Sequence, residues 1–235
     1  MGVFRQPPRI KKRVALMTGE SFDLEMEALR ASGVEERRIV HYTGQLTIIQ
    51  QRLLDQGLLS DDPLTRAKQV FEWLWKERPN RYKQKGHYKL CDVIESQLCE
   101  ENRDVGNCLG LTILYNCLLR RIGIHAGALY LENAFGVRPH VLTVLRKKDI
   151  DIEIENILPK GFDYKGRLKN PSRTRWGDPE LVADICHSLG NELFEKGKLR
   201  KALKNYDRAI TLNPAYEKAQ LNRLMVIDKL KRVSL

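Results

Sequence analysis

Cys108 has the sequence setting of a reactive cysteine. It stands between two glycines at the start of an apolar segment that is expected to be a helix, in the sequence VGNCLGLT at 105–112. The positive end of a helix macrodipole and the unpaired N–H groups of the first turn favour a thiolate and can stabilise a developing oxyanion. Given a base, this setting suits nucleophilic acyl chemistry, although a single cysteine is more often a small buried hydrophobe.

A base is available at His140, which opens the apolar segment HVLTVL. The acidic segment DIDIEIEN follows across a turn, which we expect at 146–149 rather than at 147–148 because two lysines lack the Gly or Asn of a tight turn. With either turn the two segments pair as antiparallel strands and His140 lies opposite Glu155. The carboxylate would then hold one imidazole nitrogen and leave the other to take the thiol proton.

The cysteine and histidine segments resemble the transglutaminase-like superfamily of cysteine enzymes, which includes transglutaminases, peptide N-glycanases and bacterial cysteine peptidases. In that superfamily a Cys at a helix N-terminus is followed by a His and then an Asp on neighbouring antiparallel strands. The segments GNCLGLTILYNCLLRRIGI, PHVLTVL and IEIENILPKGF match this order, and the likeness covers residues 60–165. The resemblance implies that Cys108 is the nucleophile, His140 the base and then the acid, and Glu155 the orienting group.

The third position departs from the family pattern, in which the orienting residue is usually Asp. The chain offers four candidates in the same segment, of which the expected pairing favours the first: Glu155, Glu153, Asp151 and Asn156. The resemblance implies an amide or ester acyl group of a peptide or protein as substrate. Peptide hydrolysis, deamidation and transamidation all remain open, because water or an amine can accept the acyl group.

Other charged and basic residues have simpler readings. His41 and His125 have no acidic or thiol neighbour in the sequence, and we expect surface or packing roles for them. His187 lies next to Cys186 on the first repeat helix, and we expect a structural role for it. Three arginines near the candidate site could bind an acidic substrate, although solvated charge is the usual role of such residues: Arg120, Arg121 and Arg138.

The elements that must position these residues are helices followed by strands. Apolar periodicity and capping residues predict helices over 21–31, 34–55, 63–78, 90–98 and 108–121. The period then changes, and strands are expected over 124–131, 140–145 and 150–156. Residues 157–177 are interpreted as a linker loop. The predicted fold is therefore α+β, with the cysteine-bearing helix packed on a small antiparallel sheet.

The C-terminal segment is helical again and resembles a tetratricopeptide repeat. An N-cap and a first-turn proline at 178–179 begin it, and the small and aromatic markers of the repeat follow at Gly190, Ala202, Tyr206, Ala209 and Pro214. A second repeat begins near Leu224 and has only its first helix. Because stacked repeats bury their faces only against neighbours, one and a half repeats should dock on the rest of the protein.

The predicted organisation is an N-terminal arm and helices at 1–59, a transglutaminase-like core at 60–170 and tetratricopeptide-like helices at 178–235. The arm itself, residues 1–19, is expected to be irregular. The leading functional hypothesis is a cysteine-dependent acyl-transfer enzyme with a module for protein partners. The alternative is a catalytically inactive transglutaminase-like scaffold that binds a partner through the C-terminal helices.

Composition excludes several other classes. The net charge of +11 is spread along 235 residues without an aromatic-rich basic face, so nucleic acid is not indicated as a partner. The five cysteines have neither zinc-ligand spacing nor an even count, so neither a metal, a cofactor nor a disulfide framework is expected. No apolar run is long enough to span a bilayer and no secretory signal is recognisable, and we expect a cytoplasmic protein.

Overall fold

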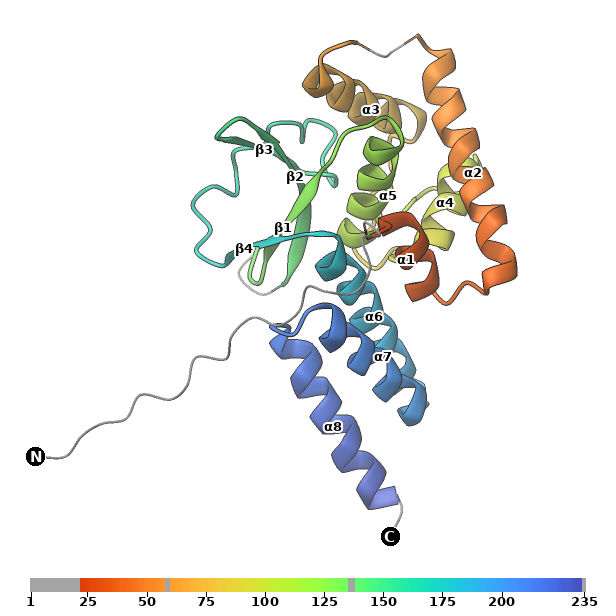
Figure 1. The fold of residues 1–235 in the computed structure, drawn as a ribbon, viewed down its shortest axis with the longest axis vertical. Coiled ribbons are helices and arrows are strands. Elements are labelled where there is room, and N and C mark those ends of the chain that lie inside the picture. Colours follow the sequence, from red (N-terminus) through yellow and green to blue (C-terminus); the bar gives the residue numbers. More distant parts are fainter. Residues whose placement is uncertain (1–21, 58–59, 135–137, 234–235) are drawn as a thin grey trace, which may run out of the picture.

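The computed structural model describes residues 22–57, 60–134 and 138–233. These residues form helices and one antiparallel sheet, which confirms the α+β class predicted from the sequence (Figure 1). The elements in chain order are α1 Leu24–Ala31, α2 Glu36–Asp55, α3 Pro63–Glu77, α4 Leu90–Leu98, α5 Cys108–Arg121, β1 Gly127–Leu131, β2 His140–Lys147, β3 Ile150–Ile154, β4 Arg173–Trp176, α6 Asp178–Glu195, α7 Leu199–Leu212 and α8 Glu217–Val233. The predicted arm at 1–19 lies outside the described residues.

Helix α5 is the centre of the structure. It lies between the sheet and helices α1 to α4, and every side chain from Leu109 to Leu119 is buried (Figure 1). The helix begins and ends where the sequence predicts, at Cys108 and at Arg121, and Gly123 then turns the chain with a left-handed φ of 78°. A helix that is apolar on all sides belongs in a core, because water would contact apolar surface on any exposed face.

A group of buried polar side chains joins α5 to the sheet. Asn156 donates from Nδ2 to the hydroxyls of Thr143 at 2.9 Å and Thr112 at 3.2 Å. The Thr143 hydroxyl donates to Oδ1 of Asn116 at 2.7 Å. We call these four residues the amide–hydroxyl network. Each has a partner on another element, so the network fixes the height of α5 above β2 and therefore the position of both candidate catalytic side chains.

The sheet has the strand order β3-β2-β1-β4, and β4 lies inside the segment predicted to be a linker. That prediction was wrong because the strand sequence Arg-Thr-Arg-Trp contains one buried side chain, Trp176. Its ring stacks on Tyr130 of β1 with centroids 4.0 Å apart. Strand β1 begins at Gly127, three residues later than expected.

The hairpin between β2 and β3 has a different register from the predicted one. The turn is the residue pair 148–149, with Lys148 at a left-handed φ of 55°, instead of a turn at 146–149. Val144 therefore pairs with Glu153, two residues beyond the expected partner. A shift of two residues keeps every side chain on its predicted face. Strand β3 ends at Ile154, so Glu155 follows the last paired residue instead of lying within the ladder.

Helices α6 and α7 form the expected helical hairpin, and they dock on the core. A Cβ at Gly190 would lie 2.5 Å from the ring of Tyr206, so glycine permits the close helix approach. The inner face of α6 joins the main hydrophobic core, and Arg208 of α7 bonds Glu27 of α1 at 3.0 Å. Helix α8 follows, in the segment where the 34-residue period predicts the first helix of a second repeat.

Candidate active site

Cys108 is the first residue of α5 and is half-buried. The helix starts here because the Asn107 side chain caps it, accepting a hydrogen bond from the Gly110 N–H at 3.1 Å. The Asn107 N–H in turn donates to the carbonyl of His87 at 2.9 Å, which ties the helix start to the preceding loop. The thiol is therefore held at the N-terminal end of the helix macrodipole, as expected from the sequence.

The two glycines around the cysteine are required by close approach of backbone. A Cβ at Gly110 would lie 2.4 Å from the carbonyl oxygen of His87 and 2.6 Å from Cγ2 of Val93. A Cβ at Gly106 would lie 2.8 Å from the same carbonyl. The loop at 81–87 can pack against the first turn of α5 only because both side chains are absent.

We expect Gly110→Ala to destabilise the fold by about 1 to 3 kcal/mol, because overpacking against a carbonyl outweighs the helix propensity gained with alanine. The matched control is Gly44→Ala in α2, where a Cβ meets nothing within 4 Å. Urea denaturation of both variants measures the difference. A Gly110→Ala protein that is as stable as the Gly44→Ala control would contradict the close approach.

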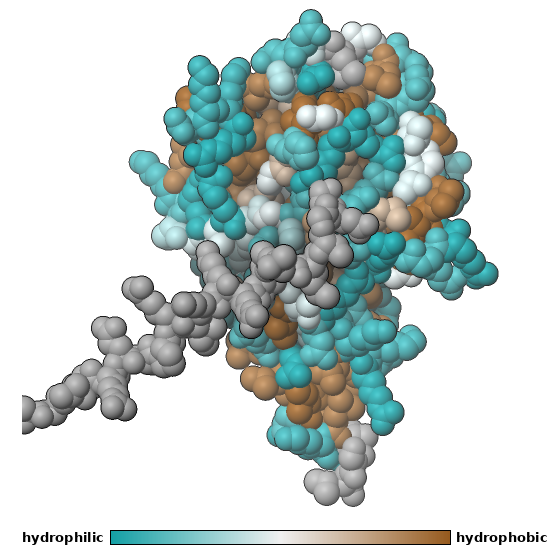
Figure 2. All heavy atoms as spheres, in the orientation of Figure 1, coloured by the Kyte–Doolittle hydropathy of each residue, from teal (hydrophilic) through white to brown (hydrophobic). Residues whose placement is uncertain are grey.

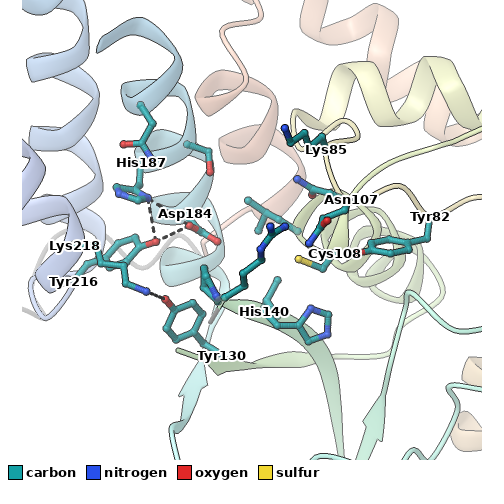
Figure 3. Close-up of a pocket in the computed structure, with 17 residues that line it drawn as sticks. Tyr82, Lys85, Asn107, Cys108, Tyr130, His140, Asp184, His187, Tyr216 and Lys218 are labelled. Atoms are coloured by element: carbon teal, nitrogen blue, oxygen red, sulfur yellow. Dashed lines mark hydrogen bonds and ion pairs between the residues drawn. The ribbon is translucent and has the colours of Figure 1, made fainter. Parts of the chain in front are cut away.

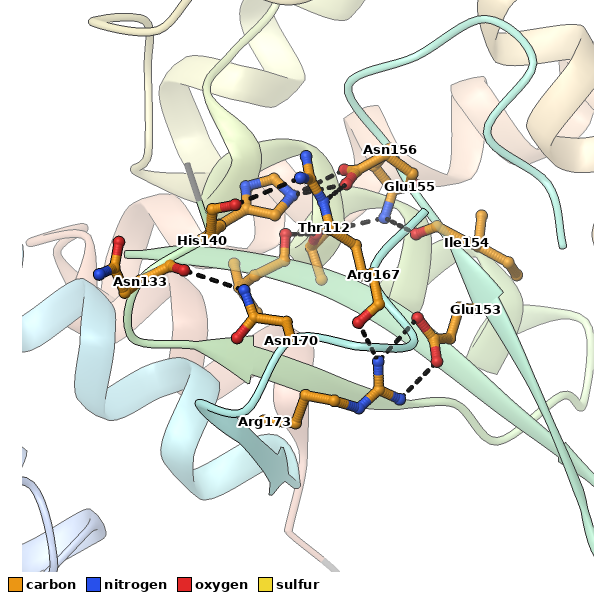
Figure 4. Close-up of polar contacts among 12 residues, drawn as sticks. Thr112, Asn133, His140, Glu153, Ile154, Glu155, Asn156, Arg167, Asn170 and Arg173 are labelled. Carbon is orange, nitrogen blue, oxygen red and sulfur yellow. Dashed lines mark hydrogen bonds and ion pairs between the residues drawn. The ribbon is translucent and has the colours of Figure 1, made fainter. Parts of the chain in front are cut away.

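His140 and Glu155 form a buried pair at the end of the hairpin. His140 Nε2 lies 2.8 Å from both carboxylate oxygens of Glu155, and both side chains are almost fully buried (Figure 4). The backbone holds Glu155 in place through its N–H, which donates to the Gly161 carbonyl at 2.8 Å. Because Glu155 takes Nε2, Nδ1 is the ring nitrogen left for the thiol.

Arg167 supports the same carboxylate from the far side. Its Nε lies 3.5 Å from Glu155 Oε2 and its Nη1 donates to the Ala134 carbonyl at 3.3 Å (Figure 4). The carbonyl of Arg167 accepts from Arg173 Nη1 at 2.7 Å. Protonated His140 and Arg167 therefore offset the cost of burying the Glu155 charge.

The surroundings of His140 favour its protonated form. Burial lowers the pKa of His140, but hydrogen bonds with Cys108 and Glu155, together with the Glu155 charge, outweigh burial and raise it to about 9. An imidazolium at neutral pH is the partner that a thiolate needs.

The other three acidic or amide candidates for the orienting position have different partners. Glu153 pairs with Arg173 at 2.5 Å, and Asp151 pairs with Arg175. Asn156 belongs to the amide–hydroxyl network below the site. Among the described residues, Glu155 is the carboxylate within hydrogen-bonding distance of His140.

A cleft of about 320 Å³ opens above Cys108 and His140, between the core and the C-terminal helices (Figure 3). The core side includes Tyr82 from the loop before α4 and Tyr130 from β1. The opposite side comes from α6, from the turn after α7 and from the start of α8, with lining residues Asp184, His187, Ser188, Asn191, Tyr216 and Lys218. The docked repeat is therefore one wall of the cleft.

Three side chains of that wall, Asp184, His187 and Tyr216, form a continuous hydrogen-bonded relay with Asn222 of α8. Asn222 Nδ2 lies 3.1 Å from His187 Nε2, and His187 Nδ1 lies 3.2 Å from the Tyr216 hydroxyl. The Tyr216 hydroxyl donates to Asp184 Oδ1 at 2.6 Å. If Asn222 donates to Nε2, Nδ1 carries the proton and donates to Tyr216, so a neutral His187 satisfies every member. We call these four residues the wall relay.

The sequence did not identify most of this wall. His187 was expected to have a packing role, and its hydrogen bonds agree with that role, but it also lines the cleft. Of the three arginines considered for an acidic substrate, Arg120 pairs with Asp178 and Arg121 pairs with Glu25 at 2.6 Å. The third arginine, Arg138, lines the cleft and is exposed. No sequence periodicity links residues on such distant segments.

Within residues 22–57, 60–134 and 138–233, no group of three or more His, Cys, Asp or Glu side chains could hold a metal ion. In the same residues, no helix has both the length and the apolar character needed to cross a membrane.

Comparison with known proteins identifies the C-terminal repeat. Residues 190–223 match the TPR repeat family, which confirms the tetratricopeptide interpretation and indicates a protein-interaction module in this part of the chain. No curated protein and no solved structure matches the chain.

Proposed function

We propose that this protein is a cysteine-dependent acyl-transfer enzyme, with a transglutaminase-like core at 60–170 beside TPR-like helices at 178–235. The observation that carries the proposal is the pairing of His140 with Glu155 at 2.8 Å in the same cleft as Cys108, which lies at the start of α5. Peptide or protein amides and esters are the substrate class. The arrangement needs neither a metal nor an organic cofactor for this chemistry.

The first half of the reaction forms a thioester. In the charged pair the Cys108 proton already lies on His140 Nδ1, and the Sγ thiolate attacks the acyl carbon to give a tetrahedral intermediate. As the intermediate collapses, the bond to the leaving group breaks and the imidazolium returns the proton to it. Glu155 keeps Nε2 occupied throughout and stabilises the positive ring.

The second half regenerates the thiol. Water or an amine enters the cleft, gives a proton to His140 and attacks the thioester carbon, and Sγ leaves and takes that proton back. Backbone N–H groups of the first turn of α5 stabilise the oxyanion in both halves. The Gly110 N–H is already bound by Asn107, so we assign the oxyanion contact to the N–H groups of Cys108 and Leu109.

A generic ester tests the proposal before any natural substrate is known. With p-nitrophenyl acetate we expect a burst of nitrophenolate and an acetyl adduct on Cys108, located by mass spectrometry. The burst should disappear in Cys108→Ala. The matched control is Cys99→Ala, which removes another half-buried thiol away from the cleft. Adding hydroxylamine should accelerate turnover by accepting the acetyl group.

The opposite result is equally clear. The enzyme proposal would be contradicted by a wild-type protein without a burst, or by a burst that persists in Cys108→Ala.

The second candidate function is a non-catalytic scaffold that binds a protein partner. It is favoured by the TPR repeat match and by three exposed apolar side chains on α8, namely Leu221, Leu224 and Met225. Figure 2 shows apolar residues gathered on the visible face of the C-terminal helices. A scaffold requires no reactive thiol, so a missing burst together with an ordinary alkylation rate at Cys108 would favour it.

A further inference from the structure

The cleft above Cys108 has an excess of positive charge. Apart from the Cys108–His140 pair, the described residues that line it include three with a positive charge (Lys85, Arg138 and Lys218) and one with a negative charge (Asp184). Because this charge faces a narrow space between two protein walls, its field is less screened by water than that of a flat surface. The occupant of such a cleft gains from negative charge.

The single acidic group is already engaged. The Asp184 carboxylate accepts from the Tyr216 hydroxyl at 2.6 Å, within the wall relay, and it lies 3.8 Å from His187 Nδ1. Burial raises the pKa of Tyr216 above its ordinary value, and the Asp184 charge adds to that shift, so the hydroxyl remains a donor to the carboxylate. The Asp184 carboxylate thus already has a hydrogen-bond donor within the wall.

The three cations line the cleft from different parts of the chain. Lys85 lies beside Asn107, on the core side of the cleft, and Lys218 lies on the opposite wall (Figure 3). Arg138 precedes His140 by two residues and is exposed. An extended substrate that passes the thiol would therefore meet positive charge on both sides of its reacting group.

Lys218 is held in position rather than free to rotate. Its Nζ donates to the Tyr130 hydroxyl at 3.1 Å and lies 3.6 Å from Glu132, which is exposed and does not line the cleft. The Tyr130 hydroxyl contributes a hydrogen-bonding group on the same side. A fixed ammonium group beside a hydroxyl suits a carboxylate ligand.

We infer that the acyl donor is an acidic peptide segment, which binds between the core and the TPR-like helices with its reacting amide or ester at Cys108 and its carboxylates near Lys85, Arg138 and Lys218. This inference rests on the proposed function and adds the substrate class to it. It also gives the docked repeat a direct part in substrate binding.

Two alkylating reagents of similar size, one charged and one neutral, test the inference. Iodoacetate is anionic and iodoacetamide is neutral, and both react with the Cys108 thiolate. The rate with iodoacetate divided by the rate with iodoacetamide should fall about two- to fivefold in Arg138→Gln and in Lys218→Gln, because each substitution removes one positive charge from the cleft. It should also fall as salt is added. The control is Lys201→Gln, an exposed lysine of α7 outside the cleft, which should leave the ratio unchanged.

A pair of peptides tests the substrate class itself. Acetyl-Glu-Glu-Gln-Glu-Glu-amide should slow the alkylation of Cys108 by iodoacetamide, and acetyl-Lys-Lys-Gln-Lys-Lys-amide should not. Equal protection by both peptides, or a reagent ratio that is the same in Arg138→Gln, Lys218→Gln and Lys201→Gln, would overturn the inference.

The two levels of proposal fail separately. The reagent ratio is measured at about pH 8.5, where an ordinary thiol also reacts, so it reports the charge of the cleft whether or not Cys108 is activated. The wild-type alkylation rate at about pH 6 reports the activation alone.

Discussion

Replacing His140 with alanine is expected to slow the alkylation of Cys108 by iodoacetamide about 10- to 100-fold at about pH 6. An ordinary cysteine is below about 1% thiolate at that pH, whereas a cysteine beside an imidazolium is expected to be mostly thiolate. The lower nucleophilicity of a stabilised thiolate reduces the difference, which sets the lower end of the range. Mass spectrometry locates the adduct, because four other cysteines are present.

The pH profile gives this prediction a second readout. Since the pKa of His140 is raised to about 9, the imidazolium is present below that pH and is lost as the pH rises through it. Acyl transfer should therefore decline above about pH 9, because His140 no longer carries the proton that the leaving group needs. Alkylation should not decline there, since it needs the thiolate alone. A slow wild-type rate at about pH 6 that His140→Ala leaves unchanged would show that the pair is not assembled.

Replacing Glu155 with alanine is expected to lower the free energy of unfolding by about 3 to 5 kcal/mol. The substitution removes the carboxylate that His140 contacts at 2.8 Å and that Arg167 Nε approaches at 3.5 Å, and it leaves two cationic side chains in a buried site. The loss corresponds to a decrease in melting temperature of about 10 °C for a chain of this size. Thermal denaturation monitored by circular dichroism measures it.

Glu153→Ala is the matched comparison. It also breaks a buried carboxylate–arginine pair, with Arg173, on the neighbouring strand, but it does not touch His140. Both variants should lose stability, whereas only Glu155→Ala should also lose the rapid alkylation of Cys108 near pH 6. If Glu155→Ala retains full thiol reactivity, Glu155 has a structural role and does not orient the imidazole.

Local sequence signals predicted the start of the site well. The glycines around Cys108 and the capping side chain of Asn107 act within one helical turn, so their effect can be read from the sequence. The bounds of α5 follow from the same short-range signals. The sequence also predicted which residues of the hairpin share a face, because any turn with an even number of residues keeps the same alternation of side chains.

The turn and the fourth strand were not predictable in the same way. A left-handed Lys148 is an unusual choice for a tight turn, so the sequence favoured a longer one and a register two residues away. Strand β4 has a single buried side chain, Trp176, and its pairing with β1 depends on a residue more than forty positions earlier, Tyr130. Neither signal exists within a short window of the sequence.

The second wall of the cleft was missed for a related reason. Asp184, Tyr216 and Lys218 line the same cleft as the thiol because α6 docks on the core. The sequence predicted that the repeat docks, but not which of its faces meets which part of the core. The markers of the repeat describe how its helices pack on each other. They say nothing of what the remaining face of the first helix meets.

The amide–hydroxyl network limits the displacement of Cys108 relative to His140. If α5 slid along the sheet by one turn, about 5.4 Å, its apolar side chains could still meet apolar neighbours after repacking. The polar groups of Thr112, Asn116, Thr143 and Asn156 could not, and each buried group left unpaired would cost about 1 to 3 kcal/mol. The position of α5 along the sheet therefore has one deep energy minimum, and this minimum sets the distance between the thiol and the imidazole.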